Sequence, residues 1–332
     1  MGWPLTLASA LLVGGLWAVQ RWPGEDWWVG ALLTWGPQVQ WLAPPVLALL
    51  LTLMARRGML AFVNLVVTAF ALFALAGFEM NDYGAPAPGE GVVRVATWNV
   101  YGHTREREVV RERILSWDCD IVCLQESADP AYRELLPGYE STRAGDLRVF
   151  VRGAILSRRV ISGARPRPQV VLVVEADTCA GPVVALTTHV PRARRSRPVP
   201  REITPLADYV REGMQVREAK FEEVLGAIPH DRPMILAGDL NTPPTSRYWY
   251  RLSQRLTDAF DAAGRGFGHT FLWRRRWPLL RIDYVWAGGG ARPLRCWVER
   301  AAPSDHRPVL AEIALPPARD SDGNLGAERE SG

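Results

Sequence analysis

Residues 234–241 (MILAGDLN) indicate how the soluble part of the chain folds. The apolar run 234–237 predicts a buried strand that ends at Asp239 and Asn241, both common turn residues. Apolar runs elsewhere also stop at an acid, an amide or an imidazole. The residues concerned are Asn99, Glu126, His189, Asp283, Asp305 and His306. Each alone is explained by a turn or a structural histidine. Strand ends on one rim converge in space, however, so together they predict a site.

Short strand patterns dominate the region after residue 91. The runs with β-type composition are 92–100, 120–125, 148–156, 170–176, 183–190, 234–237, 283–287, 294–298 and 308–315. We predict a helix from residue 104 with Val109, Val110, Ile114 and Leu115 on one side. A second is predicted over 204–228 with a buried stripe of Met214, Phe221, Val224 and Leu225. So many strands with so few helices between them argue against a doubly wound parallel sheet.

The first 80 residues contain long runs without a charged side chain at 1–20, 27–55 and 58–78. About 20 apolar residues cross the roughly 30 Å hydrocarbon layer of a bilayer. We therefore predict a membrane anchor over 1–80, with three transmembrane helices drawn from 3–20, about 31–55 and 59–78. The second is expected to be tilted or kinked, because it contains Pro44 and Pro45. A secretory signal is the alternative for the first run, but no basic residue precedes it.

Basic residues in the connections predict the orientation. The second connection holds Arg56 and Arg57, whereas the first holds Arg21 beside two acids. The positive-inside rule then places Arg56 and Arg57 in the cytoplasm. With three crossings of the cell (inner) membrane, the chain after residue 80 is extracytoplasmic. We expect 81–91 to be a semi-extended linker that does not pack, 92–316 to be the folded domain and 317–332 to be a disordered tail.

Composition leaves the type of partner open. The formal net charge is +4, and of 39 basic residues only Lys220 is a lysine. The arginines reflect either a compositional bias or phosphate recognition, for which a guanidinium suits two oxygens at once. The spacing of the four cysteines fits no zinc motif, which argues against a structural zinc site. No feature of the sequence identifies a protein partner.

Seven motifs in order resemble the endonuclease/exonuclease/phosphatase superfamily, which includes deoxyribonuclease I. They are TWNVYG (97–102), DIVCLQE (120–126), GAILSR (153–158), TTHV (187–190), GDLN (238–241), RIDYVW (281–286) and SDHRPV (304–309). The resemblance covers 92–315 and implies an α/β fold, a four-layer α/β/β/α sandwich. Tyr101 and Pro191 depart from residues common in apurinic endonucleases and neutral sphingomyelinases, which weakens assignment to those subfamilies.

The resemblance also implies roles for the residues at the strand ends. Glu126 would be the main Mg²⁺ ligand, with Asn99 and Asp305 near the metal and Mn²⁺ as an alternative ion. Asp239 and Asn241 would hold the attacking water and the phosphate. His189 would donate to a phosphate oxygen, and Asp283 would orient His306.

The chemistry itself requires such residues. A phosphodiester repels hydroxide, so a hard cation must neutralise the oxygens that gain charge during attack, and Mg²⁺ takes only one or two carboxylates. A water nucleophile needs a carboxylate or an imidazole within hydrogen-bond reach. The sequence does not decide whether Asp239 or His306 is the base.

Two basic clusters bear on the substrate. Residues 192–201 (RARRSRPVPR) follow His189, and Arg192, Arg194 and Arg195 are candidate substrate-binding residues. Residues 273–277 (WRRRW) combine arginine with tryptophan. Each cluster fits nucleic acid, an anionic lipid surface or merely a solvated loop. We thus expect a membrane-anchored, Mg²⁺-dependent phosphoesterase acting on a phosphodiester, in nucleic acid or in a phospholipid headgroup. The alternative is a catalytically inactive, membrane-tethered binding or scaffold protein that keeps the fold.

Overall fold

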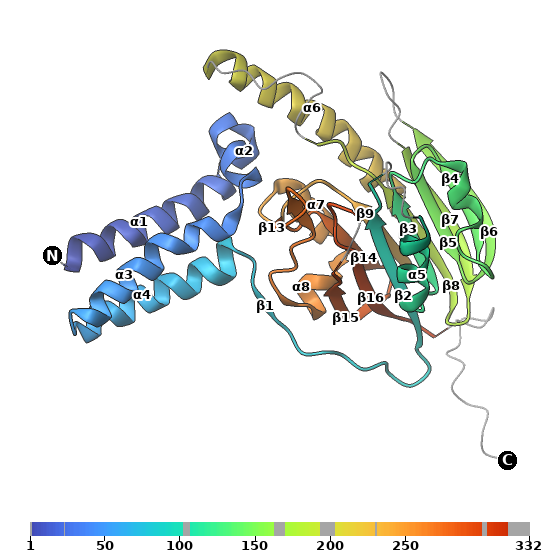
Figure 1. Cartoon of the computed structure of the whole chain (residues 1–332), viewed down its shortest axis with the longest axis horizontal. Helices are drawn as coiled ribbons and strands as arrows, with labels where there is room; N and C mark the ends of the chain where they lie inside the picture. Colours follow the sequence, from blue (N-terminus) through green and yellow to red (C-terminus); the bar gives the residue numbers. More distant parts are fainter. Residues whose placement is uncertain are drawn as a thin grey trace.

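The computed structural model describes residues 2–22, 24–101, 107–162, 170–192, 203–229, 231–300 and 304–317. A helical bundle at the N-terminus leads into a larger α/β domain (Figure 1). The tail predicted over 317–332 lies outside the described residues from 318 onward.

Two six-stranded sheets form the middle of the domain. The first has the order β15-β16-β2-β3-β5-β4, and the second β10-β14-β9-β8-β7-β6. The strands of the first sheet are β15 (Arg292–Val298), β16 (Val309–Leu315), β2 (Gly91–Asn99), β3 (Ile121–Gln125), β5 (Leu147–Val151) and β4 (Glu140–Ala144). Those of the second are β10 (Thr257–Asp258), β14 (Asp283–Gly288), β9 (Met234–Asp239), β8 (Gly181–Thr188), β7 (Val170–Thr178) and β6 (Gly153–Ser162). In each sheet one central pair is parallel, β2 with β3 and β8 with β9.

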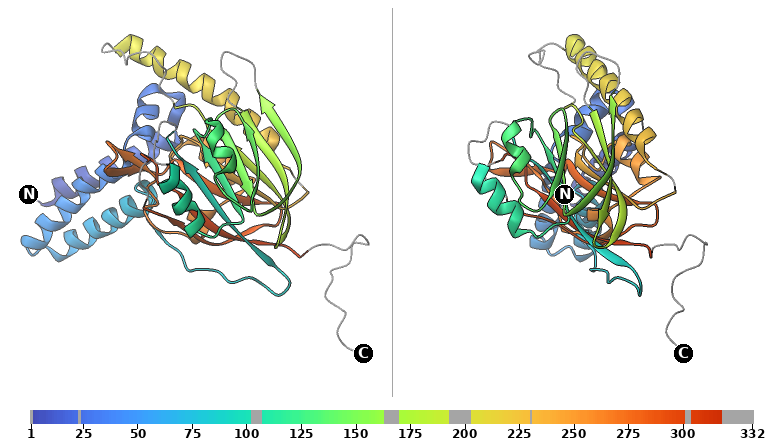
Figure 2. Two further views of the ribbon diagram at one scale, coloured as in Figure 1. Left: turned by 45° about the vertical axis from the view of Figure 1, so that its right-hand side comes forward. Right: turned by 90° about the vertical axis from the view of Figure 1, so that its right-hand side faces the viewer.

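The sheets pack face to face, and helices cover both outer faces (Figure 2). Alternate side chains of the two sheets, such as Val95, Leu172 and Ile235, meet in one fully buried core. On the second sheet, α6 (Ile203–Ala227) and α7 (Arg247–Ser253) form a second core. On the first, α5 (Arg107–Ser116) and η4 (Pro130–Glu134) form a third. The short α8 (Ala259–Ala263) packs against β14 and β15. The four-layer α/β/β/α sandwich expected from the sequence is confirmed.

The buried faces predicted for the two helices are confirmed for one helix and only in part for the other. The buried stripe of α6 is as predicted, because Met214, Phe221, Val224 and Leu225 are all buried. On α5 only Val110 and Ile114 are buried, whereas Val109 and Leu115 are about 40% exposed, at 41% and 40%. The two exposed residues lie off the i, i+4 stripe, since each residue turns a helix by about 100°.

The run 148–156 is not one strand, which corrects the sequence-based prediction. β5 ends at Val151, and β6 begins at Gly153 in the other sheet. Gly153 has φ +147°, and a Cβ there would lie 2.1 Å from the carbonyl oxygen of Asp177. The chain changes sheets at a residue where only glycine fits, and an uninterrupted apolar pattern conceals that change.

The bundle consists of α1 (Gly2–Arg21), η1 (Gly24–Asp26), α2 (Trp28–Trp35), η2 (Gln38–Leu42), α3 (Ala43–Met54), α4 (Gly58–Phe70) and the π-helical η3 (Ala71–Leu75). Two helices, Gly2–Arg21 and Gly58–Leu75, are long and apolar enough to cross a membrane. The middle run is not the single kinked helix predicted over 31–55, because Trp28–Trp35 and Gln38–Met54 meet at 91°. Pro37 lies at the break, where its missing N–H cannot continue the helix.

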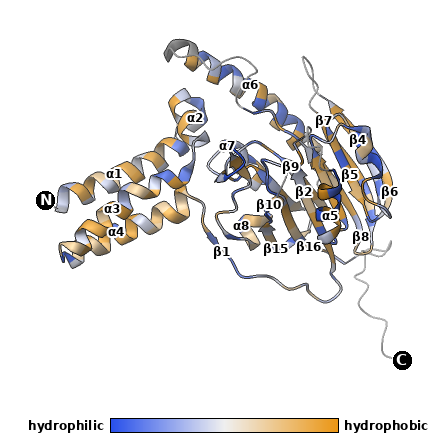
Figure 3. Ribbon diagram, in the orientation of Figure 1, coloured by the Kyte–Doolittle hydropathy of each residue, from blue (hydrophilic) through white to orange (hydrophobic). Residues whose placement is uncertain are grey.

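The helices of the bundle consist mostly of apolar residues (Figure 3), and many of their large apolar side chains are exposed. Leu11, Met59 and Phe62 are each 66% exposed, while the buried Asn64 donates to Thr6 Oγ1 at 3.0 Å and to Thr52 Oγ1 at 3.3 Å. Polar groups inside and apolar groups outside are typical of a bundle surrounded by lipid.

The segment after the bundle packs against the domain, so the prediction of an unpacked linker is wrong. β1 (Glu79–Met80) pairs with β11 (Arg265–Gly266), and the Gly84 amide donates to the Leu294 carbonyl at 2.7 Å. Arg292 forms an ion pair with Glu90 at 2.7 Å. Backbone hydrogen bonds and ion pairs rather than apolar side chains make these contacts, which is why the composition did not reveal them.

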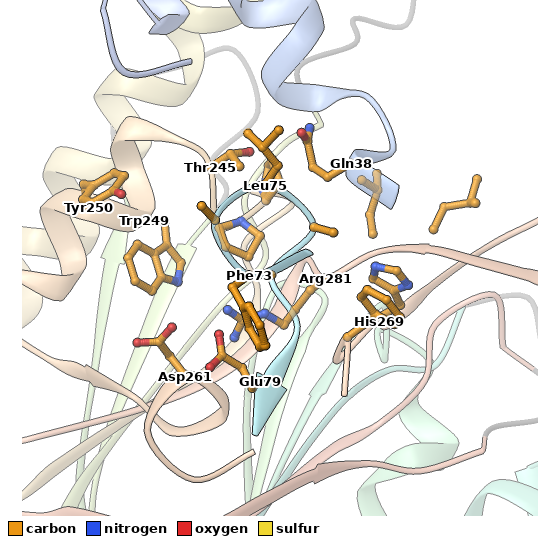
Figure 4. Close-up of a pocket in the computed structure, with 18 of the residues that line it drawn as sticks. Gln38, Phe73, Leu75, Glu79, Thr245, Trp249, Tyr250, Asp261, His269 and Arg281 are labelled. Atoms are coloured by element: carbon orange, nitrogen blue, oxygen red, sulfur yellow. The ribbon is translucent and has the colours of Figure 1, made fainter. Parts of the chain in front are cut away.

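A pocket lies where the bundle meets the domain (Figure 4). The bundle contributes Phe73 and Leu75, and the domain contributes Trp249 and Tyr250. Glu79, Asp261 and Arg281 lie close together on one side of it. Burial, reinforced by Asp261, raises the pKa of Glu79 to about 7.

Candidate active site

The predicted polar residues meet at one rim of the sandwich. Asn99 is the last residue of β2 and Asp239 the last of β9. In the second sheet Asp283 pairs with Asp239, and His189 forms a β-bridge with Asp239 on its other side. The peptide of His306 is held next to Asn99, because Trp98 Nε1 donates to its carbonyl at 2.9 Å. The rim thus combines residues from both sheets.

Asn99 connects the two sheets at the centre of this rim. Its fully buried Nδ2 donates to Glu126 Oε1 at 3.1 Å and to Asp239 Oδ2 at 3.0 Å. Its Oδ1 accepts from the Tyr101 amide at 3.0 Å. The amide nitrogen, not the oxygen, therefore faces the carboxylates and holds them side by side.

Asp239 is surrounded by donors. Besides Asn99, the Asn241 amide donates to its Oδ1 at 2.9 Å. Oδ2 lies 3.6 Å from His189 Nε2 and 3.9 Å from His306 Nε2. Asp239 is completely buried, so this one oxygen is the point on which two imidazoles and an amide converge.

His306 and Asp283 form a buried dyad. His306 Nδ1 lies 2.8 Å from Asp283 Oδ2, and Nε2 is buried without a hydrogen-bond partner among the described residues. Burial alone would lower the pKa of His306, but the carboxylates of Asp283 and Asp239 outweigh it and raise the pKa to about 9. The Thr270 hydroxyl accepts from the Asp283 amide at 3.2 Å and fixes the start of β14.

His189 has a partner that the sequence did not reveal. Its Nδ1 lies 2.8 Å from Asp146 Oδ2. Burial opposes the charged imidazole, but the hydrogen bond that His189 donates to Asp146 and the charge of Asp239 raise the pKa of His189. In sequence, Gly145-Asp146 reads as an ordinary turn between strands, and no local signal links it to residue 189.

Backbone conformation at the rim is unusual. Glu126 has φ +55° and Asn241 has φ +44°, both in the left-handed region that non-glycine residues rarely adopt. Gly238 precedes Asp239, and a Cβ there would lie 2.3 Å from the Thr188 carbonyl oxygen. The glycine lets β8 and β9 approach closely enough to bring His189 beside Asp239.

The donor set suits a hard divalent cation. Asp305 Oδ1 is buried without a partner among the described residues, and the carboxylate of Glu126 lies beside Asn99. A carboxylate oxygen such as Asp305 Oδ1 is a hard ligand and fits Mg²⁺ better than a soft metal. A second acidic group, Asp239, Asp283 and His306, has ligand atoms within 4.8 Å of one another. In that group the Asp283–His306 hydrogen bond already uses two of the ligand atoms.

The arginines predicted to bind substrate are only partly described. The Arg192 guanidinium lies 6.0 Å from the centre of the Phe271 ring, and that ring packs edge-to-face on His306. Arg192 therefore lies at the edge of the site. Arg194 and Arg195 lie outside the described residues.

The chain resembles proteins of a known family. The sequence model of the endonuclease/exonuclease/phosphatase family matches residues 96–306, while no match is found among curated proteins. A family member from Bacteroides vulgatus is similar at a TM-score of 0.52 and 20% identity, covering 68% of this chain and 99% of that one.

Two DNA-related structures are also similar. A 3' phosphatase from Neisseria bound to a product DNA hairpin gives a TM-score of 0.52 and 17% identity, with 67% and 99% covered. An AP endonuclease from Archaeoglobus fulgidus gives 0.51 and 15%, with 66% and 98% covered. These likenesses concern the fold. The family's sequence model spans more than half of this chain, and the rim residues follow the family's order. The chain therefore belongs to the endonuclease/exonuclease/phosphatase family.

Proposed function

We propose that the protein is a membrane-anchored, Mg²⁺-dependent phosphodiesterase in which water attacks phosphorus directly. The observation that carries the proposal is the shared Asn99 nitrogen, which holds Glu126 and Asp239 together between two histidines. An inactive scaffold would have no use for this concentration of ionisable groups, because burying several of them together is costly.

The residues divide the work by their charge at neutral pH. His306, with its raised pKa, keeps its proton and donates through Nε2 to a phosphate oxygen. Asp239 Oδ2 orients the water and takes its proton, which makes Asp239 rather than His306 the base. His189 donates to a second oxygen, while Asn241, whose Nδ2 donates to the Val190 carbonyl, stabilises the adjoining loop. As the new P–O bond forms, the ester P–O bond breaks and its oxygen leaves with a proton from solvent. Glu126 and Asp305 would hold Mg²⁺, which when bound would neutralise charge at the phosphate.

The test uses the full chain in nanodiscs and a soluble chromogenic diester. Wild-type protein should hydrolyse it with Mg²⁺ and not with EDTA. Asp239→Asn, Glu126→Gln and His306→Asn should each lose about 10²–10⁴-fold in kcat. Equal activity of these variants and an active wild type would refute the proposed site. A wild-type protein with neither activity nor Mg²⁺ binding by calorimetry would favour the scaffold alternative.

The bundle supports anchoring with the domain outside the cytoplasm. The N-terminus and the α3–α4 turn lie at the end of the bundle away from the domain (Figure 1). Arg56 and Arg57 are exposed in that turn. If α1, the bent middle segment and α4 each cross the bilayer, these arginines face the cytoplasm and the domain faces the opposite side. A reporter fused after residue 85 tests this, and a cytoplasmic signal there would refute it.

A tryptophan–arginine hairpin favours a phospholipid headgroup as substrate. β12 (Phe271–Trp273) and β13 (Trp277–Leu280) form a hairpin that contacts η2 of the bundle (Figure 2, left). Trp273 and Trp277 at its tip are 48% and 54% exposed, with Arg274 4.6 Å from the Trp273 ring centre. Exposed tryptophan beside arginine is typical of a membrane interface. At the base of the same hairpin, the Leu272 amide donates to the Asp305 carbonyl at 2.7 Å, which joins it to the site.

Nucleic acid is the second candidate, favoured by the similar structures that act on or bind DNA. Replacing both Trp273 and Trp277 by Ala distinguishes the two. For a lipid substrate, hydrolysis in vesicles should fall about tenfold while hydrolysis of the soluble diester is unchanged. For a nucleic-acid substrate, wild-type protein should cleave DNA or RNA with a rate that falls steeply as salt rises.

A further inference from the structure

The anchor places a buried carboxylate inside the catalytic domain. Glu25, in η1 between α1 and α2, is only 5% exposed. Its Oε2 accepts from the Ser246 hydroxyl and from the Arg247 amide, both at 2.8 Å, at the start of α7. Its Oε1 accepts from Trp35 Nε1 at 2.7 Å. Glu25 thus satisfies a helix N-terminus in a domain more than 200 residues away along the chain.

A second buried charge faces the same region from the domain. Arg217 of α6 is fully buried, and its guanidinium lies 4.0 Å from the centre of the Trp35 ring. Burial lowers the pKa of Arg217 to about 10, and the charge of Glu25 opposes that shift. Trp35 therefore contacts both ions: its ring covers the guanidinium and its N–H reaches the carboxylate.

Arg217 in turn holds the two loops that carry catalytic residues. Nη1 donates to the Pro191 carbonyl, two residues after His189. Nη2 donates to the Thr242 hydroxyl and, at 3.4 Å, to the Leu240 carbonyl, on either side of Asn241. The loops also bind each other, because the Val190 amide donates to the Asp239 carbonyl at 2.9 Å. One guanidinium thus fixes the chain beside His189 and beside Asp239.

We infer that Glu25 and Trp35 of the anchor are positioning residues of the active site and act through Arg217. Without them the guanidinium loses the ring closest to it, at 4.0 Å against 5.6 and 5.7 Å for Tyr248 and Phe221, and the negative charge that most favours its charged form, so its hold on both loops weakens. Activity is thereby coupled to docking of the anchor on α6 and α7. The effect on turnover rests on the proposed phosphodiesterase function, whereas the effect on loop stability does not.

The experiment compares Glu25→Gln, Trp35→Ala and Trp35→Phe in the full chain in nanodiscs, with Asp26→Asn as the matched control. Asp26 is next to Glu25 in the sequence, and its side chain is 72% exposed. It pairs with the side chain of Arg247, whereas Glu25 accepts from the Arg247 backbone amide. The readouts are kcat on the soluble diester, Mg²⁺ affinity, and hydrogen exchange of the Val190 and Asn241 amides.

Glu25→Gln and Trp35→Ala should each lower kcat about tenfold and speed exchange at both amides about tenfold. Mg²⁺ affinity should change less than twofold, because neither Glu126 nor Asp305 lies on these loops. Trp35→Phe keeps a ring over the guanidinium and should recover part of the loss. The double variant should be little worse than either single one, since both act through one residue.

Three results would overturn the inference: unchanged exchange in both variants, a loss in Asp26→Asn as large as in Glu25→Gln, or fully additive losses. If Trp35→Ala fails to fold, Trp35→Phe and Glu25→Gln still decide. If the wild-type chain hydrolyses no diester, the proposed function fails, and the exchange data alone decide the positioning role.

Discussion

Replacing Asn99 separates two roles that the same residue could have. The motif resemblance implies an oxygen near the metal, whereas the structure shows an amide nitrogen donating to Glu126 and Asp239. Aspartate keeps the oxygen and removes the donor, and alanine removes both. If Asn99 supplies an oxygen to Mg²⁺, Asn99→Asp should be the milder change. If it holds two carboxylates together, Asn99→Asp should be the more harmful one.

The geometry gives the magnitude. Both carboxylate oxygens lie about 3 Å from one nitrogen, at 3.1 and 3.0 Å, so they are at most about 6 Å apart. At that distance two charges repel by about 3 kcal/mol at an effective dielectric constant of 20. Two hydrogen bonds to charged groups offset this with about 1.5–3 kcal/mol each. Asn99→Ala should therefore cost about 3 kcal/mol of metal-free stability, and Asn99→Asp about 2 kcal/mol more, because it adds a third negative charge.

The assay measures the free energy of unfolding of the full chain in EDTA, and kcat/KM on the soluble diester with saturating Mg²⁺. We expect the order wild type, Asn99→Ala, Asn99→Asp in stability, and a loss of about 10²–10⁴-fold in kcat/KM for both variants. A metal-free Asn99→Asp protein as stable as wild type, with near-normal activity and tighter Mg²⁺ binding, would refute the donor role.

Further predictions concern the surroundings of the rim. Gly238→Ala forces β8 and β9 apart by about 1 Å. It should lower the free energy of unfolding, measured with denaturant, by about 1–3 kcal/mol and abolish activity. A variant with the stability and the activity of wild type would contradict the close approach of the two strands. Asp146→Asn removes a charge-assisted hydrogen bond to His189 and should lower kcat/KM about 10- to 100-fold. The control is Asp177→Asn, at an exposed acid that forms no ion pair among the described residues. Because the pKa of Glu79 is about 7 in the folded protein and about 4.5 in the unfolded chain, its protonation stabilises the fold fully below pH 4.5. That contribution is lost as pH rises through 7. Glu79→Gln should flatten this decline in unfolding free energy, and an unchanged slope would show that another group causes it.

Sequence patterns predicted the rim because they are local. A strand that ends at a polar residue is visible in six residues, and the sandwich brings such ends together whatever the details of packing. Asn99, Asp239 and His306 could be found in this way. Their orientation could not, because whether Asn99 turns its oxygen or its nitrogen to the acids depends on the Tyr101 amide, which holds the oxygen.

Residues that act across the fold left no local signal. Asp146 lies in a glycine turn, and Arg217 is one of three basic residues on a helix whose apolar stripe was predicted correctly. Their roles depend on which loop each faces, and the packing of layers decides that. Arg217 is nevertheless fully buried, with backbone carbonyls as its acceptors. Such burial of a guanidinium is costly unless it is paired, so it marks a residue that the fold depends on.

The structure also changes the interpretation of the basic residues in the anchor. Counted along the sequence, Arg21 partly balances Arg56 and Arg57 and weakens the predicted orientation. In the structure the Arg21 guanidinium lies 4.3 Å from the ring centre of Tyr250, a residue of the catalytic domain, and 5.4 Å from that of Trp17. Arg56 and Arg57 remain exposed at the opposite end of the bundle. Arg21 therefore contacts the domain at the end of the bundle nearest to it. Arg56 and Arg57 remain as the exposed charges that favour the cytoplasmic side of a membrane.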